Sequence, residues 1–167
     1  MTTHRLRLAK STWDGVIGDL RRPHRVVHER LGILTCKTGS ASGGAIVFLP
    51  VGYTPFADDL YETSKDDSTV LVGSKAITFA MSLALKTKLS CLFVHLHGHT
   101  GVPRLSNPDK FHGPNMVKAL LNANRTIPHG YVVFSWNACA GLVATPGGEP
   151  ALSRFVTSIL SNKLEVR

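Results

Sequence analysis

Residues 90–99 read SCLFVHLHGH and carry the strongest structural signal in the chain. The apolar run at 91–94 predicts a buried central strand, and His95, His97 and His99 follow it at alternate positions. Because side chains alternate between the two faces of a strand, all three imidazoles are expected to point to the same face. Two of them can therefore share one metal ion.

A carboxylate follows these histidines at loop distance. Asp109 can return to the end of the strand as a third ligand. Two histidines and one carboxylate, with the fourth position open to water, form the catalytic and not the structural type of zinc site. A polar strand face is the alternative, since eight histidines is a high count. We favour one zinc ion per chain, because imidazoles at the end of a buried strand need partners.

The rest of the chain predicts strands mixed with helices. Strands are predicted by apolar or alternating runs at 4–10 (an edge strand), 31–37, 45–51 and 131–136. Helices are predicted from the capping-box spacing at Ser11, over 74–88 and around 116–123, while 151–161 fits either type. The polar stretch 52–68 predicts a surface loop. Strands and helices without strict alternation favour an α/β (α+β) fold, and 1–167 has room for a single domain.

The bulk composition excludes several classes of protein. With 43% hydrophobic and 18% charged residues, the chain has the composition of a globular protein. We expect no membrane partner, because no apolar run reaches the roughly 18 residues that a membrane helix needs. The first residues lack the apolar run of a secretory signal, which predicts a cytoplasmic location. The three cysteines form no CxxC pair and are expected to be buried free thiols.

The formal net charge of +8 raises the question of a nucleic-acid partner. The basic residues are scattered apart from a cluster at 21–30, and no RNA-binding aromatic signature or glycine clamp accompanies them. We therefore expect no direct nucleic-acid function. Attraction to an acidic protein is equally consistent with the charge.

Two motifs resemble those of one enzyme family. Residues 29–34, ERLGIL, look like the E-x-x-G-[LIM]-[LM] start of the JAMM motif. Residues 94–109, VHLHGHTGVPRLSNPD, resemble its continuation, H-x-H followed by Ser and Asp. The chain is thus similar to the JAMM (MPN+, JAB-domain) zinc metalloproteases, above all to their prokaryotic JAB branch. The resemblance implies an MPN/JAB-like (cytidine-deaminase-like) fold, with a mixed β-sheet flanked by helices.

The resemblance also implies a role for each residue of the motif. Glu29 would be the general acid/base and not a ligand, carrying a proton from water to the leaving lysine amine. Ser106 would donate a hydrogen bond to the oxyanion, although it can equally cap a helix with Asp109. The metal ligands would be Asp109 and two of the three histidines.

The spacing leaves two histidine pairs open. Counted from His95, Ser106 comes one residue later than in the family pattern, and counted from His97 it comes one residue earlier. His97 belongs to both pairs. We expect His95 and His97 to be the ligands, because a loop longer by one residue costs little. The size of Leu96 between them, where the family usually has a small residue, remains unexplained.

The implied function is that of a zinc-dependent isopeptidase. It would cut the amide bond after the C-terminus of ubiquitin or a ubiquitin-like protein, in deconjugation or precursor maturation. The resemblance also implies partners that are similar to ubiquitin-activating and ubiquitin-conjugating proteins, and a bacterial role in antiphage defence. The alternatives are the processing of a sulfur-carrier-type protein or short peptide, and a non-catalytic MPN scaffold without metal.

Overall fold

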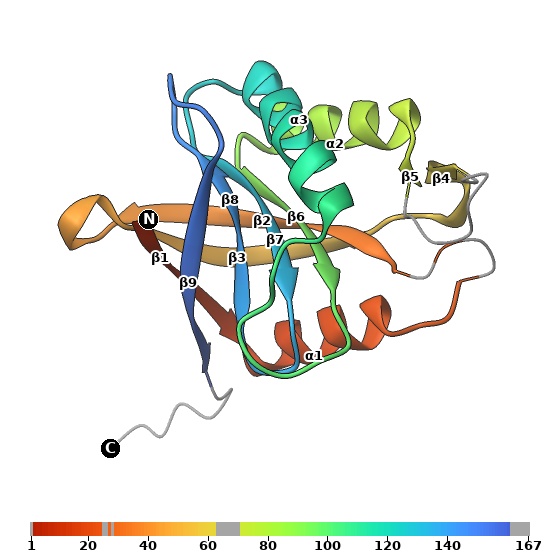
Figure 1. Cartoon of the computed structure of the whole chain (residues 1–167). Coiled ribbons are helices and arrows are strands. Elements are labelled where there is room, and N and C mark those ends of the chain that lie inside the picture. Colours follow the sequence, from red (N-terminus) through yellow and green to blue (C-terminus); the bar gives the residue numbers. More distant parts are fainter. Residues whose placement is uncertain (1, 25–26, 28, 63–70, 161–167) are drawn as a thin grey trace.

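The computed structural model of the chain describes residues 2–24, 27, 29–62 and 71–160. Seven strands close into a barrel in the order β1-β3-β2-β6-β7-β8-β9, and β4 and β5 form a separate small sheet (Figure 1). The strands are β1 (Thr2–Ala9), β2 (Leu31–Ser40), β3 (Ile46–Pro55), β4 (Tyr61–Glu62), β5 (Leu71–Val72), β6 (Ser90–Leu96), β7 (His129–Phe134), β8 (Cys139–Ala144) and β9 (Ala151–Leu160). The helices are α1 (Lys10–Leu20), α2 (Ser74–Thr87) and α3 (Asn107–Ala123), with single 3-10 turns at Ser42–Gly44 and Asp58–Leu60.

The closed barrel shows that the expected MPN/JAB-like fold, a mixed sheet flanked by helices, is wrong. The segment that fitted either a helix or a strand forms β9, which pairs antiparallel with β8 and parallel with β1. On its other side β1 pairs parallel with β3, so β1 is not the edge strand that its sequence predicts. Closure gives every long strand two neighbours and leaves no edge of the sheet unpaired.

Two hydrophobic cores lie on the two sides of the barrel wall. Inside, Val16 and Leu20 of α1 pack with barrel residues such as Leu8, Val94 and Phe134. Outside, α2 and α3 cover β2, β6 and β7, as Figure 1 shows from the side. The face of α2 toward the barrel consists of alanines at helical spacing, Ala76, Ala80 and Ala84, all fully buried. Their small size lets the helix lie close against the strands.

All three expected helices are present, and one of them, α2, starts where the sequence predicts. The helix expected over 74–88 is confirmed as α2. The first helix is also present, but it begins at Lys10 after an N-cap at Ala9 that makes no side-chain hydrogen bond, so the capping box at Ser11 is wrong. The third helix starts earlier than expected, at Asn107. None of the helices among the described residues has the length and apolar character needed to cross a membrane.

The strands differ from the expectations mainly at two places. The stretch expected as a loop from 52 contains the end of β3, the turn at Asp58–Leu60 and β4, while its part at 63–68 lies outside the described residues. β8 was not expected, because CAGLVA is short and rich in small residues. Its Gly141 lies so close to the backbone of Tyr131 in β7 that no side chain would fit there. Packing against β7 therefore selects the small residues that made the strand hard to see.

Candidate metal centre

A histidine pair and a glutamate face each other because β2 and β6 are antiparallel neighbours. Leu31 of β2 pairs with His95 of β6, so Glu29, two residues before Leu31, falls opposite His97 on the same face. The Nε2 atoms of His95 and His97 are 3.1 Å apart. Each lies 3.6 Å from a carboxylate oxygen of Glu29. The ligand atoms of these three residues lie within 4.8 Å of one another, so the group can hold a metal ion.

Asp109 reaches the same place from the first turn of α3. Its Oδ1 lies 3.4 Å from His95 Nε2 and its Oδ2 lies 3.6 Å from His97 Nε2. The helix begins where it does because Ser106 and Asp109 form a capping box. The Asp109 amide donates to Ser106 Oγ over 3.2 Å, and the Ser106 amide donates to Asp109 Oδ2 over 2.7 Å. The cap thus fixes the carboxylate at the histidines.

A tyrosine that the sequence reasoning missed holds the other oxygen of this carboxylate. The Tyr131 hydroxyl, on β7, donates a 2.7 Å hydrogen bond to Asp109 Oδ1. The Tyr131 ring also packs beside the His95 ring, with centroids 5.3 Å apart. A signal was available, because a tyrosine inside an apolar strand normally brings its hydroxyl to a polar partner. The sequence does not say which partner.

The spacing of these donor atoms fits a tetrahedral metal ion. Zinc at 2.0–2.1 Å from nitrogen and oxygen ligands separates neighbouring ligands by about 3.3–3.4 Å. The two imidazole Nε2 atoms are 3.1 Å apart, and each has one Asp109 oxygen nearby, Oδ1 at 3.4 Å from His95 and Oδ2 at 3.6 Å from His97. Two imidazoles with one carboxylate also match the preference of zinc for nitrogen and oxygen donors. The residues therefore fit the ion in both number and kind.

The protonation states fit as well, because metal binding requires neutral imidazoles and an ionised carboxylate. Burial lowers the pKa of His95 to about 4. Burial also lowers the pKa of His97. Desolvation acts to raise the pKa of Asp109, but His95 and the hydrogen bonds from Tyr131 and Ser106 outweigh it and lower that pKa. The three groups are thus in the binding form at neutral pH.

One feature departs from the usual zinc histidine. Nδ1 of His95 is buried and has no hydrogen-bond partner among the residues that the structure describes. The second nitrogen of a zinc-binding histidine normally donates to a carbonyl or carboxylate. The orientation of the His95 ring therefore depends on packing, chiefly against Tyr131.

Glu29 differs from the other three groups in exposure and in charge state. Its side chain is 36% exposed, whereas that of Asp109 is 6% exposed. Desolvation, with a smaller contribution from Asp109, raises the pKa of Glu29 to about 7. In the metal-free protein Glu29 can therefore exchange protons with solvent near neutral pH. A bound dication would lower this pKa again.

The backbone next to Glu29 is anchored by its neighbour. The Arg30 guanidinium donates to the carbonyls of Arg22 and Pro23 and to Asp58 Oδ1, over 3.0–3.2 Å. The amide of Leu31 donates to the Tyr61 hydroxyl over 2.7 Å. These contacts hold the start of β2, and with it the glutamate, against the end of β6.

The structure brings Glu29, His95, His97 and Asp109 together, while His99 stays outside this group with its ring centroid 6.0 Å from that of His97. His99 is exposed, and its Nδ1 lies 3.0 Å from the carbonyl of its neighbour Thr100. Strand alternation predicted that all three imidazoles share a face, but β6 ends at Leu96 and the chain turns at once. In that turn the His99 amide donates to the His97 carbonyl over 2.8 Å. The alternation therefore ends before the third histidine.

The side chains of the candidate metal centre, with Tyr131 behind them, come from four separate parts of the chain. These are the segment before β2, the end of β6, the start of α3 and β7. In comparisons with known proteins, no family model matches this chain and no curated protein matches it.

Proposed function

We propose that the chain is a zinc-dependent isopeptidase of the JAMM type, which hydrolyses the amide bond after the C-terminus of ubiquitin or a ubiquitin-like protein. The single observation that carries this proposal is the convergence of two imidazoles and a buried carboxylate with a second, half-exposed carboxylate. Three of these groups have the number, kind and spacing of catalytic zinc ligands. The fourth, Glu29, is partly exposed to solvent, so its carboxylate can exchange protons with water.

His95, His97 and Asp109 would hold the zinc ion. When bound, the ion supplies a Lewis acid and lowers the pKa of water in its open position. Glu29 would accept a proton from the attacking water and pass it to the leaving amine, a task for which an ionised, partly exposed carboxylate beside the histidines is suited. Both carboxylate oxygens of Glu29 face the histidines, one near each Nε2 atom, so the carboxylate lies next to the position at which the attacking water would lose its proton.

Ser106 would stabilise the oxyanion that forms when water attacks the carbonyl. Its hydroxyl oxygen accepts a hydrogen bond from the Asp109 amide. This bond uses a lone pair of the oxygen and leaves the hydroxyl proton available to donate. No described residue accepts that proton in the structure. Capping the helix and donating to the substrate are therefore compatible roles for one hydroxyl.

The choice of substrate depends on the motif resemblance and not on the geometry. The same chemistry would cut any amide that follows a thin C-terminal tail. On that resemblance, the partners are the modifier, its conjugates and proteins that are similar to ubiquitin-activating and ubiquitin-conjugating enzymes.

A second candidate is a closed metal site without hydrolysis. Glu29 lies at 3.6 Å from both imidazoles, which is as near as Asp109, so its carboxylate can equally be the fourth ligand. Four protein ligands leave no position for water, which is the mark of a structural zinc site. In the closed site Glu29 is a ligand and its loss lowers zinc affinity, whereas in the catalytic site its loss leaves zinc affinity unchanged.

The experiment that separates them pairs zinc content with cleavage. The purified protein is incubated with linear fusions and lysine conjugates of ubiquitin-like proteins, with and without a chelator, and mass spectrometry locates the cut. For Glu29→Ala we expect a loss of about 10²–10⁴-fold in cleavage rate with zinc retained. Asp109→Ala should lose both zinc and cleavage. Glu149→Ala, which removes an exposed carboxylate on another surface, is the control and should change neither.

Two outcomes would reject the proposal. If Glu29→Ala loses zinc as fully as Asp109→Ala and the wild type cuts none of the substrates, the site is a closed structural one. If the wild type binds no stoichiometric zinc, neither candidate stands.

A further inference from the structure

The outer face of β9, β1, β3 and β2 carries a set of unpaired cations. Arg154 (β9), Arg5 and Arg7 (β1) and Lys37 (β2) all point outward and are exposed. None of them forms an ion pair with another residue in the described part of the chain. The four strands contain no aspartate or glutamate. We call these four residues and the side chains between them the basic face.

The pairing of the strands places these cations in neighbouring rows. Arg5 pairs with Val156 on one side and with Val47 on the other. Arg7 pairs with Ser158, and Lys37 pairs with Leu49. Since residues two apart on a strand are separated by about 7 Å and adjacent strands by about 4.8 Å, the cations form one continuous field.

Aliphatic side chains are interleaved with the cations. Leu49 is 40% exposed, Leu152 is 52% exposed and Val156 is 54% exposed. They are on this face because the inward positions of the same strands, such as Leu6, Phe48 and Phe155, already fill the interior of the barrel. These exposed aliphatic residues beside the cations offer a partner both apolar and charged groups on one face.

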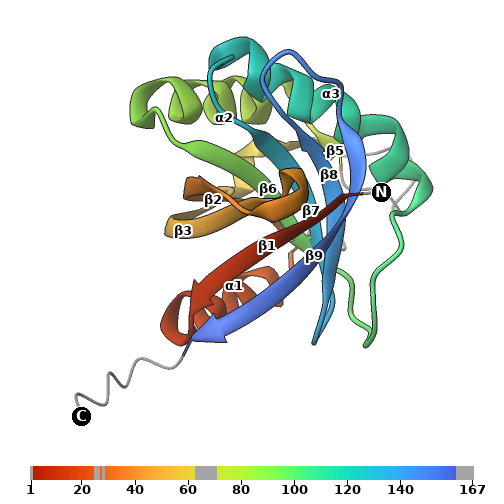
Figure 2. The same cartoon turned by 90° about the vertical axis from the view of Figure 1, so that its left-hand side faces the viewer.

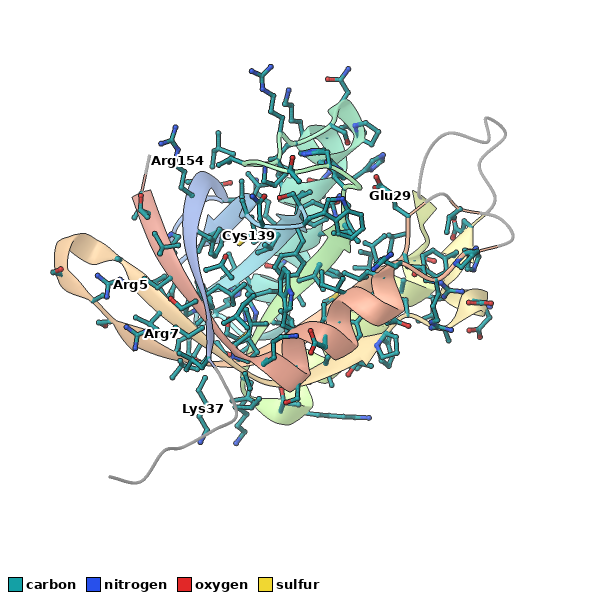
Figure 3. All side chains as sticks on the ribbon, turned by 90° about the horizontal axis from the view of Figure 1, so that it is seen from below. Arg5, Arg7, Glu29, Lys37, Cys139 and Arg154 are labelled. Carbon is teal, nitrogen blue, oxygen red and sulfur yellow. The ribbon has the colours of Figure 1, made fainter. Side chains whose placement is uncertain are left out.

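None of the helices α1, α2 and α3 covers the basic face. Figure 2 shows β1 and β9 across the front of the molecule, with α1 behind them and α2 and α3 along the top. Figure 3 shows Arg5, Arg7 and Arg154 at one side of the molecule and Glu29 at the other. A partner on this face would leave the candidate metal centre accessible.

We infer that the basic face binds an acidic, amphipathic segment of a partner protein, in which carboxylates alternate with aliphatic residues. Charge complementarity is the first reason, because four cations that have no counter-charge among the described residues attract an anionic partner. Three of the four are arginines, whose planar guanidinium pairs with carboxylates in a bidentate manner and is enriched at protein interfaces. The aliphatic residues between them match an apolar stripe on the same segment.

Other occupants fit the face less well. A second copy of this chain would bring like charges together across the symmetric contact. The eight residues of β1 span about 26 Å and four strands span about 14 Å, so the face has a flat outline of roughly 370 Å², before the relief of its side chains is added. A stable interface uses about 800 Å² per partner. The basic face therefore has the footprint of a peptide segment.

Nucleic acid and membrane are also less suitable. The outward positions offer no aromatic ring for a base to stack on, which single-stranded nucleic acids normally require. Along β9, Leu152 and Val156 flank Arg154 on the same face. The outward positions of these strands also lack the Trp and Phe side chains with which membrane-surface segments normally anchor among the headgroups. This inference is independent of the proposed zinc chemistry.

The test measures peptide binding by fluorescence polarisation. The probe is a labelled peptide of alternating glutamate and leucine, roughly eight residues long, which spans about 26 Å when extended. We expect it to bind the full chain, and Arg5→Glu with Arg7→Glu to weaken binding about tenfold. Leu152→Thr with Val156→Thr should weaken it as well. The matched control is Lys75→Glu with Arg125→Glu, which changes the net charge equally at exposed sites elsewhere and should leave binding within a factor of about two.

Four outcomes would overturn the inference. The first is that the peptide does not bind the wild type, and the second is that the control pair weakens binding as much as the Arg5 and Arg7 pair does. The third is that a peptide of glutamate alone binds as tightly, since the aliphatic residues would then contribute nothing. The fourth is that an oligothymidylate or a phosphatidylserine vesicle, and not the peptide, depends on these arginines. If charge reversal impairs folding, as judged by near-UV circular dichroism, Arg5→Gln with Arg7→Gln replaces it.

Discussion

Replacing Tyr131 by phenylalanine removes the hydroxyl group that donates a hydrogen bond to Asp109 of the candidate metal centre, and it leaves the aromatic ring in place. The lost interaction is the 2.7 Å hydrogen bond from the Tyr131 hydroxyl to Asp109 Oδ1. Because the acceptor is a buried carboxylate, such a bond contributes about 1.5–3 kcal/mol to the free energy of unfolding. Asp109 would keep the Ser106 amide on its other oxygen but could rotate about that contact.

Two measurable effects follow from this loss. Removing a group that orients a metal ligand typically lowers metal affinity about 10–100-fold, so zinc affinity measured by competition with a chelator should fall by that factor in Tyr131→Phe. The zinc-free protein should also be less stable in urea by about 1.5–3 kcal/mol at neutral pH. The first effect reports on the metal centre and the second on the fold.

The pH dependence of the second effect has a defined sign. The bond from Tyr131 helps to lower the pKa of Asp109 below 3.8, so the folded state holds the ionised form more strongly than the unfolded chain does. This stabilisation is present above that value and is lost as the pH falls through the lower folded-state pKa. The difference in stability between the wild type and Tyr131→Phe should therefore shrink in acid.

Tyr53 supplies a matched control. Its hydroxyl donates a 2.6 Å hydrogen bond to Asp19 Oδ2, between β3 and α1, and neither residue is part of the metal centre. Tyr53→Phe should lower stability by a similar amount while zinc affinity stays at the wild-type value. If Tyr131→Phe binds zinc as tightly as Tyr53→Phe does, Asp109 is not a ligand that Tyr131 orients, and the reasoning is refuted.

Three further predictions concern the helix cap, the buried histidine and a tight contact in β2. Ser106→Ala removes the cap of α3 and should cost about 1 kcal/mol in urea unfolding, whereas Ser106→Thr should recover most of it. Burial lowers the pKa of His95 to about 4 from 6.5, so its neutral form in the folded state should make stability fall as the pH drops from 6.5 toward 4. His95→Gln should flatten that part of the pH profile of the zinc-free protein, and an unchanged slope would contradict the burial argument. Gly32→Ala should destabilise the fold by about 1–3 kcal/mol in thermal or urea unfolding, because its Cβ would collide with the Tyr53 ring, and a neutral result would show that the ring can move aside.

Local chemistry made several features of the site visible in the sequence. The capping box at Ser106 and Asp109 depends on residues three apart, so its spacing was visible, although the helix was expected only around 116–123 and α3 begins at Asn107. The common face of His95 and His97 follows from the alternation of a strand whose apolar lead-in is equally local. Such features need no knowledge of the remaining chain. They suffice to predict two imidazoles and a carboxylate that can meet.

The same local rules failed where a distant segment decides the outcome. The capping-box spacing at Ser11 predicted a helix start that the structure does not use, because α1 begins directly at the end of β1. His99 satisfies the alternation but lies beyond the end of β6, whose length is set by its pairing with β7. Nothing in the sequence around Tyr131 identifies its hydrogen-bond partner, because that partner, Asp109, comes from the first turn of α3.

By itself, the sequence determined most of the strands and helices and the ligand types that meet at the site, since helix caps, strand alternation and side-chain chemistry depend on residues near one another in the chain. Only the tertiary structure decided that the sheet closes into a barrel. That closure requires β1 and β9, the first and last described strands, to pair along eight residues, and no local pattern encodes it. It also decided that Glu29 meets the histidines, because the register of β2 against β6 sets it opposite His97. Pairing between distant strands depends on the free energy of the whole assembled barrel, which cannot be predicted from residues that are neighbours in the sequence.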